Sequence, residues 1–169
     1  MITKFAAATT GRRLLFATFF LLALSVLYPG LLRAEEGIDP AQVNSYFFSI
    51  NYPGVGVGWR FQRHSLELKS YHDGTNFGIG PRYDYHWATF NGGTLYLSTE
   101  YLQVDFEGDL SEGSGEIYGL GQGLELFLAE NYTFGVDVGP YQVDLEDDDT
   151  SISADGWEII MNLNFKFYF

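Results

Sequence analysis

The sequence contains no cysteine, and this absence excludes a disulfide framework, a thiol nucleophile and a cysteine-linked lipid anchor. Basic residues are also scarce: 9 lysines and arginines stand against 22 aspartates and glutamates, for a formal net charge of −13. This charge argues against binding to nucleic acid or to an anionic surface by bulk attraction. What the chain has instead is 18% aromatic residues and 20 glycines among 169 residues, which favours a single all-β domain.

The amino-terminal segment has the layout of a secretory signal peptide. Three basic residues precede an apolar stretch over residues 14–27, Pro29 interrupts it, and a cleavage point follows Ala34. We therefore predict a signal peptide over residues 1–34 and a mature domain over residues 35–169. An uncleaved membrane anchor is the alternative, which the break at Pro29 disfavours.

The last segment of the chain alternates between apolar and polar residues almost without a fault. One face carries Trp157, Ile159, Met161, Leu163, Phe165, Phe167 and Phe169. A side-chain period of two predicts a half-apolar strand about thirteen residues long, near the length that crosses a bilayer at a tilt. This strand resembles the closing strand of bacterial outer-membrane β-barrels, whose terminal Phe is read by the assembly machinery. The resemblance implies an assembly signal at Phe165, Phe167 and Phe169.

Seven further alternating segments precede this strand. They lie at about residues 46–52, 55–61, 65–71, 77–87, 95–106, 118–128 and 132–138. Tight turns are predicted near Arg63-His64, Asn91-Gly92-Gly93 and Glu130-Asn131, and longer connections, two of them acidic, at residues 72–75, 107–115 and 146–156. Eight strands with short turns at one rim and longer loops at the other predict an up-and-down transmembrane β-barrel.

Alternation alone does not tell a membrane barrel from a soluble, lipocalin-like barrel with an apolar interior. The polar face distinguishes them, because glycines on it are interspersed with isolated charges: Gly54, Gly56, Gly58, Gly78, Gly80, Gly119, Gly121, Gly123 and Gly135. In the narrow lumen of an eight-stranded barrel, small residues make room for long charged ones. We therefore predict that the apolar face meets lipid and the polar face lines the lumen.

Three irregularities interrupt the pattern: Pro81, Pro140, and a phase shift at Tyr101-Leu102 that places Leu102, Val104 and Phe106 on the apolar face. Proline lacks a donor for the ladder, and a bulge lets a strand keep its apolar residues outward past a break. All three are expected near the outer interface.

The charged residues of the polar face form a candidate lumen network: Arg60, Glu67, Lys69, Arg82, Asp84, Glu100, Glu125, Asp137 and Lys166. Buried charges must pair with opposite ones, and the turn at Asn91-Gly92 should place Arg82 close to Glu100. Two interpretations stay open. The network either fills and stiffens the barrel, or it acts as a gate whose pair exchange opens a narrow ion path.

No catalytic, cofactor-binding or metal site is predicted. The three histidines, His64, His72 and His86, show no pattern of a nucleophile with its base, and His64 and Ser65 point to opposite faces of an extended chain. The acidic connections lack the spacing of a dedicated calcium motif, although they could share divalent ions with lipopolysaccharide phosphates.

These features together resemble the small eight-stranded outer-membrane barrels typified by the transmembrane part of outer-membrane protein A. The resemblance covers residues 35–169 at the level of architecture. It implies export to the outer membrane of a Gram-negative-type cell, with membrane lipid, lipopolysaccharide and the barrel assembly machinery as partners. The expected function is non-enzymatic, in envelope structure or surface interaction. A narrow porin-like conduit is the first alternative, and a lipid A-modifying enzyme is the second.

Overall fold

The computed structural model describes residues 44–52, 54–73, 76–107, 112–147 and 153–169. The predicted signal peptide, residues 1–34, lies outside these residues. Eight strands run in order: β1 Ser45–Tyr52, β2 Val55–Phe61, β3 His64–Asp73, β4 Asn76–Phe90, β5 Gly93–Glu107, β6 Glu112–Ala129, β7 Tyr132–Asp147 and β8 Ser153–Tyr168. Among the described residues, we find no helix with the length and apolar character needed to cross a membrane.

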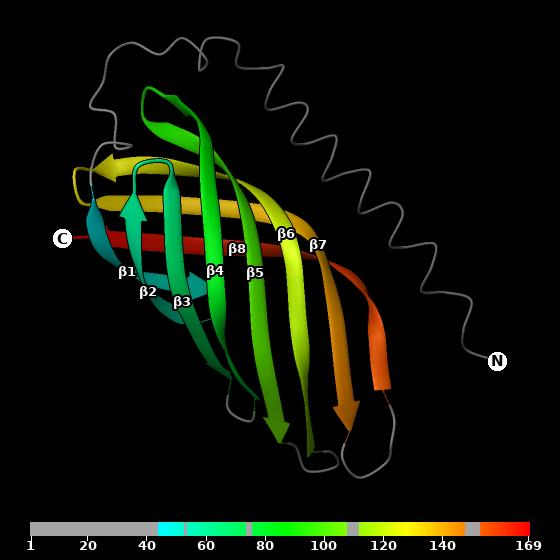
Figure 1. The fold of residues 1–169 in the computed structure, drawn as a ribbon. Coiled ribbons are helices and arrows are strands. Elements are labelled where there is room, and N and C mark those ends of the chain that lie inside the picture. Colours follow the sequence, from blue (N-terminus) through cyan, green and yellow to red (C-terminus); the bar gives the residue numbers. More distant parts are fainter. Residues whose placement is uncertain (1–43, 53, 74–75, 108–111, 148–152) are drawn as a thin grey trace.

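Each strand pairs antiparallel with the next, and β1 pairs with β8, so the sheet closes into a barrel (Figure 1). The closing seam runs from Phe47 opposite Tyr168 to Tyr52 opposite Leu163. The predicted fold class, an eight-stranded antiparallel up-and-down barrel, is confirmed. Closure leaves the paired parts of β1 and β8 without a free edge.

Three tight turns lie at one end of the barrel, which we call the turn rim. They fall at Gln62-Arg63, Asn91-Gly92 and Glu130-Asn131, and the first is one residue earlier than predicted. Gly92 has a φ of 92°, a conformation that glycine adopts without steric cost. The opposite end is called the open rim.

The strands differ greatly in length. β1 and β2 have 8 and 7 residues, whereas β6 has 18. The β1–β2 hairpin therefore ends at Gly54, which has a φ of 101°, before it reaches the open rim. Strands β4 to β8 continue beyond it toward that rim. We call that continuation the extended sheet: residues 76–79, 102–107, 112–117, 141–147 and 153–160. Figure 1 shows β7 and β8 bending as they pass from the barrel into it.

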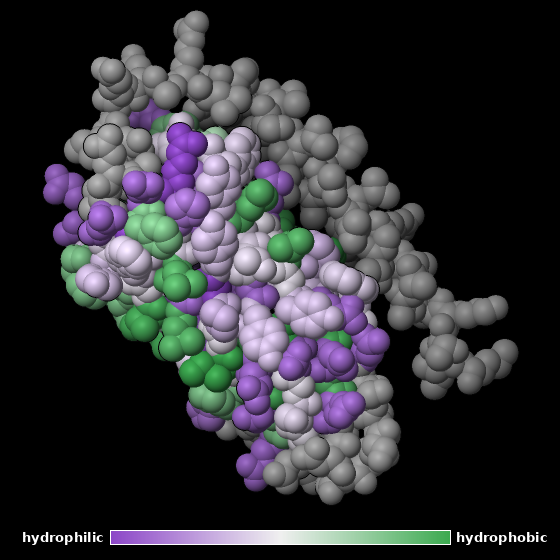
Figure 2. Space-filling view, viewed as in Figure 1, coloured by the Kyte–Doolittle hydropathy of each residue, from purple (hydrophilic) through white to green (hydrophobic). Residues whose placement is uncertain are grey.

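Within the barrel the apolar side chains point outward and the charged ones inward. Large apolar residues on every strand are exposed, among them Ile50, Val57, Leu68, Tyr85, Leu97, Leu120, Tyr132 and Phe165. Figure 2 shows hydrophobic side chains gathered over β2 and β3 and hydrophilic ones toward the ends of the molecule. The lipocalin-like alternative, with an apolar interior, does not describe the barrel.

The predicted phase shift at Tyr101-Leu102 is wrong. β5 and β6 stay in register from Gly93 to Glu107, and Leu102 and Val104 are buried on the inner face of the sheet. The physical reason is that polarity inverts on β5 to β7 of the extended sheet: their inner face carries Leu102, Val104, Ile117 and Val143, and their outer face carries acids. Leu102 therefore follows the alternation without a bulge.

The prolines cause no bulge either, since the registers on both sides of Pro81 and Pro140 are unshifted. A glycine precedes each proline, and a Cβ on Gly80 would lie 1.9 Å from the Tyr101 carbonyl oxygen. The bulges lie instead near the turn rim, between His86 and Ala88 and between Phe127 and Ala129.

The acidic connections are shorter than predicted, because the strands extend into them. β5 ends at Glu107 and β6 begins at Glu112, while β7 ends at Asp147 and β8 begins at Ser153. Six acids in or beside these two connections are thus strand residues exposed on the outer face of the extended sheet: Asp105, Glu107, Glu116, Asp144, Glu146 and Asp155. A solvated outer face explains why the strands tolerate so many carboxylates.

Candidate functional site: the charged lumen

The nine charged residues that the sequence places on the polar face all lie inside the barrel, and none is more than 4% exposed. They come from seven strands: Arg60 of β2, Glu67 and Lys69 of β3, Arg82 and Asp84 of β4, Glu100 of β5, Glu125 of β6, Asp137 of β7 and Lys166 of β8. Alternation explains this arrangement, because inward positions recur every second residue on each strand.

Arg82 is the hub of the network. Its Nε donates to Asp84 Oδ1 at 2.8 Å, its Nη1 to Glu100 Oε2 at 3.2 Å, and its Nη2 to Asp137 Oδ2 at 2.6 Å. The Glu100 contact joins neighbouring strands, whereas the Asp137 contact crosses the lumen from β4 to β7. A planar guanidinium suits this role because its five donors point in fixed directions.

Two lysines complete the central cluster. Lys69 Nζ donates to Glu100 Oε1 at 2.7 Å, and Lys166 Nζ donates to Asp84 Oδ2 at 3.0 Å. The second bond joins β8 to β4 across the barrel. Lys166 Nζ also lies 5.0 Å from the ring centroid of Phe47, a favourable position for a cation.

A second cluster lies nearer the turn rim, around Glu125. Arg60 Nη1 lies 3.3 Å from Glu125 Oε2, joining β2 to β6. The hydroxyls of Thr133 and Tyr168 donate to Glu125 Oε1 at 2.7 and 2.8 Å. Both carboxylate oxygens are therefore engaged, which offsets the cost of burying the charge.

Glu67 differs from the other buried carboxylates because no salt bridge reaches it within the described residues. Its Oε1 accepts from Ser49 Oγ at 2.5 Å and from Asn51 Nδ2 at 2.8 Å, and its Oε2 has no hydrogen-bond partner. With Glu67 included, the nine charged residues of the lumen are five carboxylates and four lysine or arginine cations, and His86 is counted as neutral.

Three buried aromatic rings fill the space that the charges leave: Phe47, Tyr96 and Tyr141. Each sits over a glycine of another strand. A Cβ on Gly123 would lie 2.4 Å from Tyr96 Cζ, and a Cβ on Gly58 would lie 2.3 Å from Phe47 Cζ. The polar-face glycines thus make room for aromatic rings as well as for charges. Tyr96 also donates to Asp137 Oδ2 at 3.0 Å.

Sequence reasoning missed one contact, between Ser65 and His86. Ser65 Oγ lies 3.0 Å from His86 Nε2, and His86 Nδ1 lies 3.6 Å from Glu125 Oε2. The order Ser–His–Glu is that of a hydrolase triad. However, all three are at most 1% exposed, 3.6 Å is too long for a hydrogen bond, and His86 Nδ1 has no partner. A nucleophile without access to substrate gives no catalytic site.

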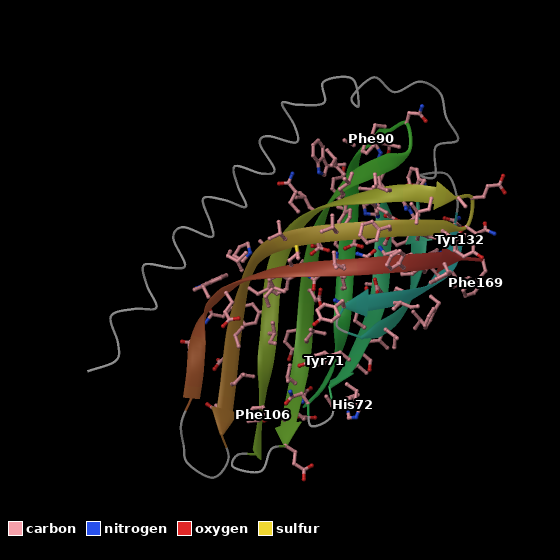
Figure 3. The ribbon with its side chains drawn as sticks, turned by 180° about the vertical axis from the view of Figure 1, so that it is seen from behind. Tyr71, His72, Phe90, Phe106, Tyr132 and Phe169 are labelled. Atoms are coloured by element: carbon pink, nitrogen blue, oxygen red, sulfur yellow. The ribbon has the colours of Figure 1, made fainter. Side chains whose placement is uncertain are left out.

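The other predicted residues lie on the outside. Phe165 and Phe167 face outward from β8, and Phe169 is 79% exposed, held by its backbone N–H donating to the Tyr46 carbonyl. In Figure 3, Phe169, Tyr132 and Phe90 lie at the turn rim, and Tyr71, His72 and Phe106 at the open rim. No cluster of three or more potential metal ligands occurs in the part of the chain that the structure describes.

Comparison with known proteins yields one similar structure, the N-terminal β-barrel domain of Pseudomonas aeruginosa OprF. It is 19% identical to this chain, with a TM-score of 0.48, over 74% of this chain and 94% of that domain. No protein-family profile matches the sequence, and no curated protein matches it.

Proposed function

We propose that this protein is an outer-membrane β-barrel with a filled lumen, serving envelope structure or surface interaction without catalysis. The single observation that carries the proposal is the inverted polarity of the barrel. Large apolar side chains are exposed around its circumference, from 37% at Tyr85 to 74% at Tyr52, while 9 charged side chains are buried within it. Soluble proteins rarely expose a contiguous apolar surface of that extent.

The transition from barrel to extended sheet supports an outer membrane boundary at that level. On the outer face of β5, Tyr101 is followed by Gln103 and Asp105. On β6 and β8, Tyr118 and Trp157 hold the same place between apolar and acidic residues. Amphipathic rings are favoured where lipid tails give way to headgroups and water. The extended sheet then faces the medium, and the turn rim faces the periplasm.

The pattern of ion pairs supports a structural lumen. Arg82–Asp137, Lys166–Asp84 and Arg60–Glu125 each join strands that are not neighbours in the sheet. Side chains that cross a narrow bore occupy the space through which a solute would pass. Export by the predicted signal peptide and recognition of the Phe-ended strand by the assembly machinery would bring the chain to this location.

Heat-modifiable migration on a detergent gel, after membrane fractionation, tests the proposal. We expect the protein in the outer-membrane fraction, with the unheated form migrating differently from the boiled form, because a closed barrel resists detergent at room temperature. A soluble periplasmic protein whose migration is unchanged by heating would overturn the proposal.

One observation favours the alternative of a narrow conduit. Five buried polar atoms in the described lumen have no partner: Arg60 Nε, Glu67 Oε2, His86 Nδ1, Ser98 Oγ and Asn164 Oδ1. Buried polar atoms that lack protein partners are commonly met by water, so a hydrated path would account for them. Planar-bilayer recordings decide this point. We expect no conductance for wild type and none for Glu100→Ala, and a stepwise current in either would favour the conduit.

A further inference from the structure

We propose that the outer half of β8, Ser153–Asn162, is a docking edge that takes up an extended, basic peptide segment as an added strand. This inference rests on the proposed function, because it requires the extended sheet to face the medium outside the cell.

The pairing of β8 is the first observation. On one side, β8 pairs with β7 from Ser153 through Phe167. On the other side, its pairing with β1 begins only at Leu163. No described strand pairs with Ser153–Asn162 on that side, because the β1–β2 hairpin ends nearer the turn rim than this segment does. Figure 1 shows this outer half of β8 as the border of the extended sheet.

An unpaired edge presents backbone N–H and C=O groups at every second residue. Such an edge binds an extended segment through main-chain hydrogen bonds, and side-chain pockets then select among segments. Barrels normally remove their edges by closure, and this one is closed only along its shorter half.

The inner face of the extended sheet supplies the apolar part of the site. Register places Leu102, Ile117 and Val143 in one row that ends at Gly156 on β8. Leu102 is buried, whereas Ile117 and Val143 are half-buried. An added strand would direct every second side chain onto this face, where Gly156 leaves open space: a Cβ there meets nothing within 4 Å.

Charge decides what kind of segment fits. Glu158 projects from the inner face of β8 and is exposed, and Asp155 is exposed on the outer face. On β7, Asp144 and Glu146 are exposed beside them. No lysine or arginine occurs in the sequence between Tyr83 and Phe165, so the extended sheet has no basic residue to neutralise these acids. A partner strand with Lys or Arg opposite Glu158 gains a cross-strand ion pair, and an acidic one is repelled.

The same charges disfavour the other occupants. A second copy of this chain would bring its own acids against Glu158 and Asp155. An anionic lipid headgroup would meet like charge at the same positions. The occupant that suits both the open backbone and the carboxylates is therefore a basic peptide in β conformation.

The test uses the full chain in detergent or nanodiscs and three synthetic ten-residue probes: alternating Lys-Val, alternating Glu-Val, and the Lys-Val peptide with two prolines. Fluorescence polarisation measures binding. We expect the Lys-Val peptide to bind, the Glu-Val peptide to fail, and the proline peptide to bind at least tenfold more weakly, since proline lacks the backbone donor. Equal binding of the proline peptide would overturn strand addition.

Matched charge variants separate docking from general attraction. Glu158→Lys should weaken Lys-Val binding tenfold or more, whereas Asp105→Lys, the same charge change three strands away on β5, should have a much smaller effect. Equal losses in the two variants would overturn the edge site. Concentration-dependent dimerisation that competes with the peptide would assign the edge to a second copy and overturn the peptide proposal.

A site-specific readout is available because the chain has no cysteine. Gly156→Cys should undergo rapid thiol–disulfide exchange with a Lys-Val peptide whose central cysteine is activated as a mixed disulfide with thionitrobenzoate, releasing the thionitrobenzoate anion as the leaving group. Gln103→Cys, on the outer face of β5, should react slowly. Equal rates would contradict docking at β8. If every variant keeps heat-modifiable migration but no peptide binds, this inference fails while the proposed function stands. Loss of the outer-membrane location would contradict the proposed function itself.

Discussion

Arg82 Nη2 lies 2.6 Å from Asp137 Oδ2, and this bond joins β4 to β7 through the centre of the barrel. The two strands do not touch in the sheet, so the contact braces opposite walls. Arg82 also holds Glu100 and Asp84, which makes one side chain the counter-charge of three carboxylates. The stability of the barrel should therefore depend strongly on this residue.

Replacing Arg82 by Met tests that dependence. The variant leaves Asp84, Glu100 and Asp137 buried with fewer cations, and we expect the free energy of unfolding to fall by about 3–5 kcal/mol. Urea titration of the protein in lipid vesicles, followed by tryptophan fluorescence, measures the change. Asp137→Asn added to Arg82→Met should restore part of the loss, because it removes one unpaired charge. Equal stability of wild type and Arg82→Met would show that the network does not hold the walls together.

Arginine substitutions along the outer face of β5 locate the membrane. Leu97 lies among the exposed apolar residues, and Gln103 lies on the same face in the extended sheet. Leu97→Arg should cost about 2–4 kcal/mol in vesicles if it lies near the bilayer midplane, and Gln103→Arg about 0–1 kcal/mol. Vesicle refolding titrations compare the two variants. Equal costs would contradict a boundary between these positions.

Glycine at position 123 is required for packing of the lumen. A Cβ there would lie 2.4 Å from Tyr96 Cζ and 2.7 Å from Asp137 Cβ, so Gly123→Ala must displace the ring. We expect a loss of about 1–3 kcal/mol, as for other overpacked cores. Gly156→Ala is the matched control, since it meets open space, and its unfolding midpoint should equal that of wild type. A neutral Gly123→Ala would mean that the ring has room to move.

The exposed Phe169 should matter for assembly more than for stability. Its side chain is 79% exposed, so Phe169→Asn removes little packing. We expect a lower yield in the outer membrane of cells but unchanged refolding into detergent micelles. Trp157→Asn is the control, because Trp157 is also exposed but lies at the other end of β8. Similar cellular yields for the two variants would argue against an assembly signal at Phe169.

The buried Ser65 and His86 should have no effect on membrane lipids. Both are fully enclosed, so we expect cells that produce wild type, Ser65→Ala or no protein to have the same lipid A mass profile. A mass shift that depends on Ser65 would establish a lipid-modifying activity and contradict a structural lumen.

The fold and the inward-facing side of each strand could be predicted because strand alternation and lumen chemistry act together. A strand face that combines glycines with isolated charges suits a narrow lumen, where small residues make room for long charged ones. Arg82 and Lys166 were therefore predicted to face inward once a barrel was predicted. Ladder pairing across tight turns then placed Arg82 beside Glu100. These inferences need only the period of two and the position of one turn.

The open rim could not be predicted in the same way. Alternation places Leu102 on the opposite face of β5 from Tyr101. Because apolar residues were expected to face lipid, an outward Leu102 required a bulge that the strand does not have. In β5, the polar residues Gln103 and Asp105 on the outer face are the local signal that the outer surface changes from apolar to polar. The Ser65–His86 contact was missed for a different reason: it depends on register between β3 and β4, although both residues share the inward phase.

The seam between β1 and β8 sets the order of biogenesis. β1 is the first described strand, and its closing partner is the segment from Leu163 to Tyr168. Until β8 has been synthesised, β1 has only β2 as a pairing partner, and the barrel cannot close. We therefore expect the pairing of β8 with β1, which closes the cylinder, to be the last step of folding.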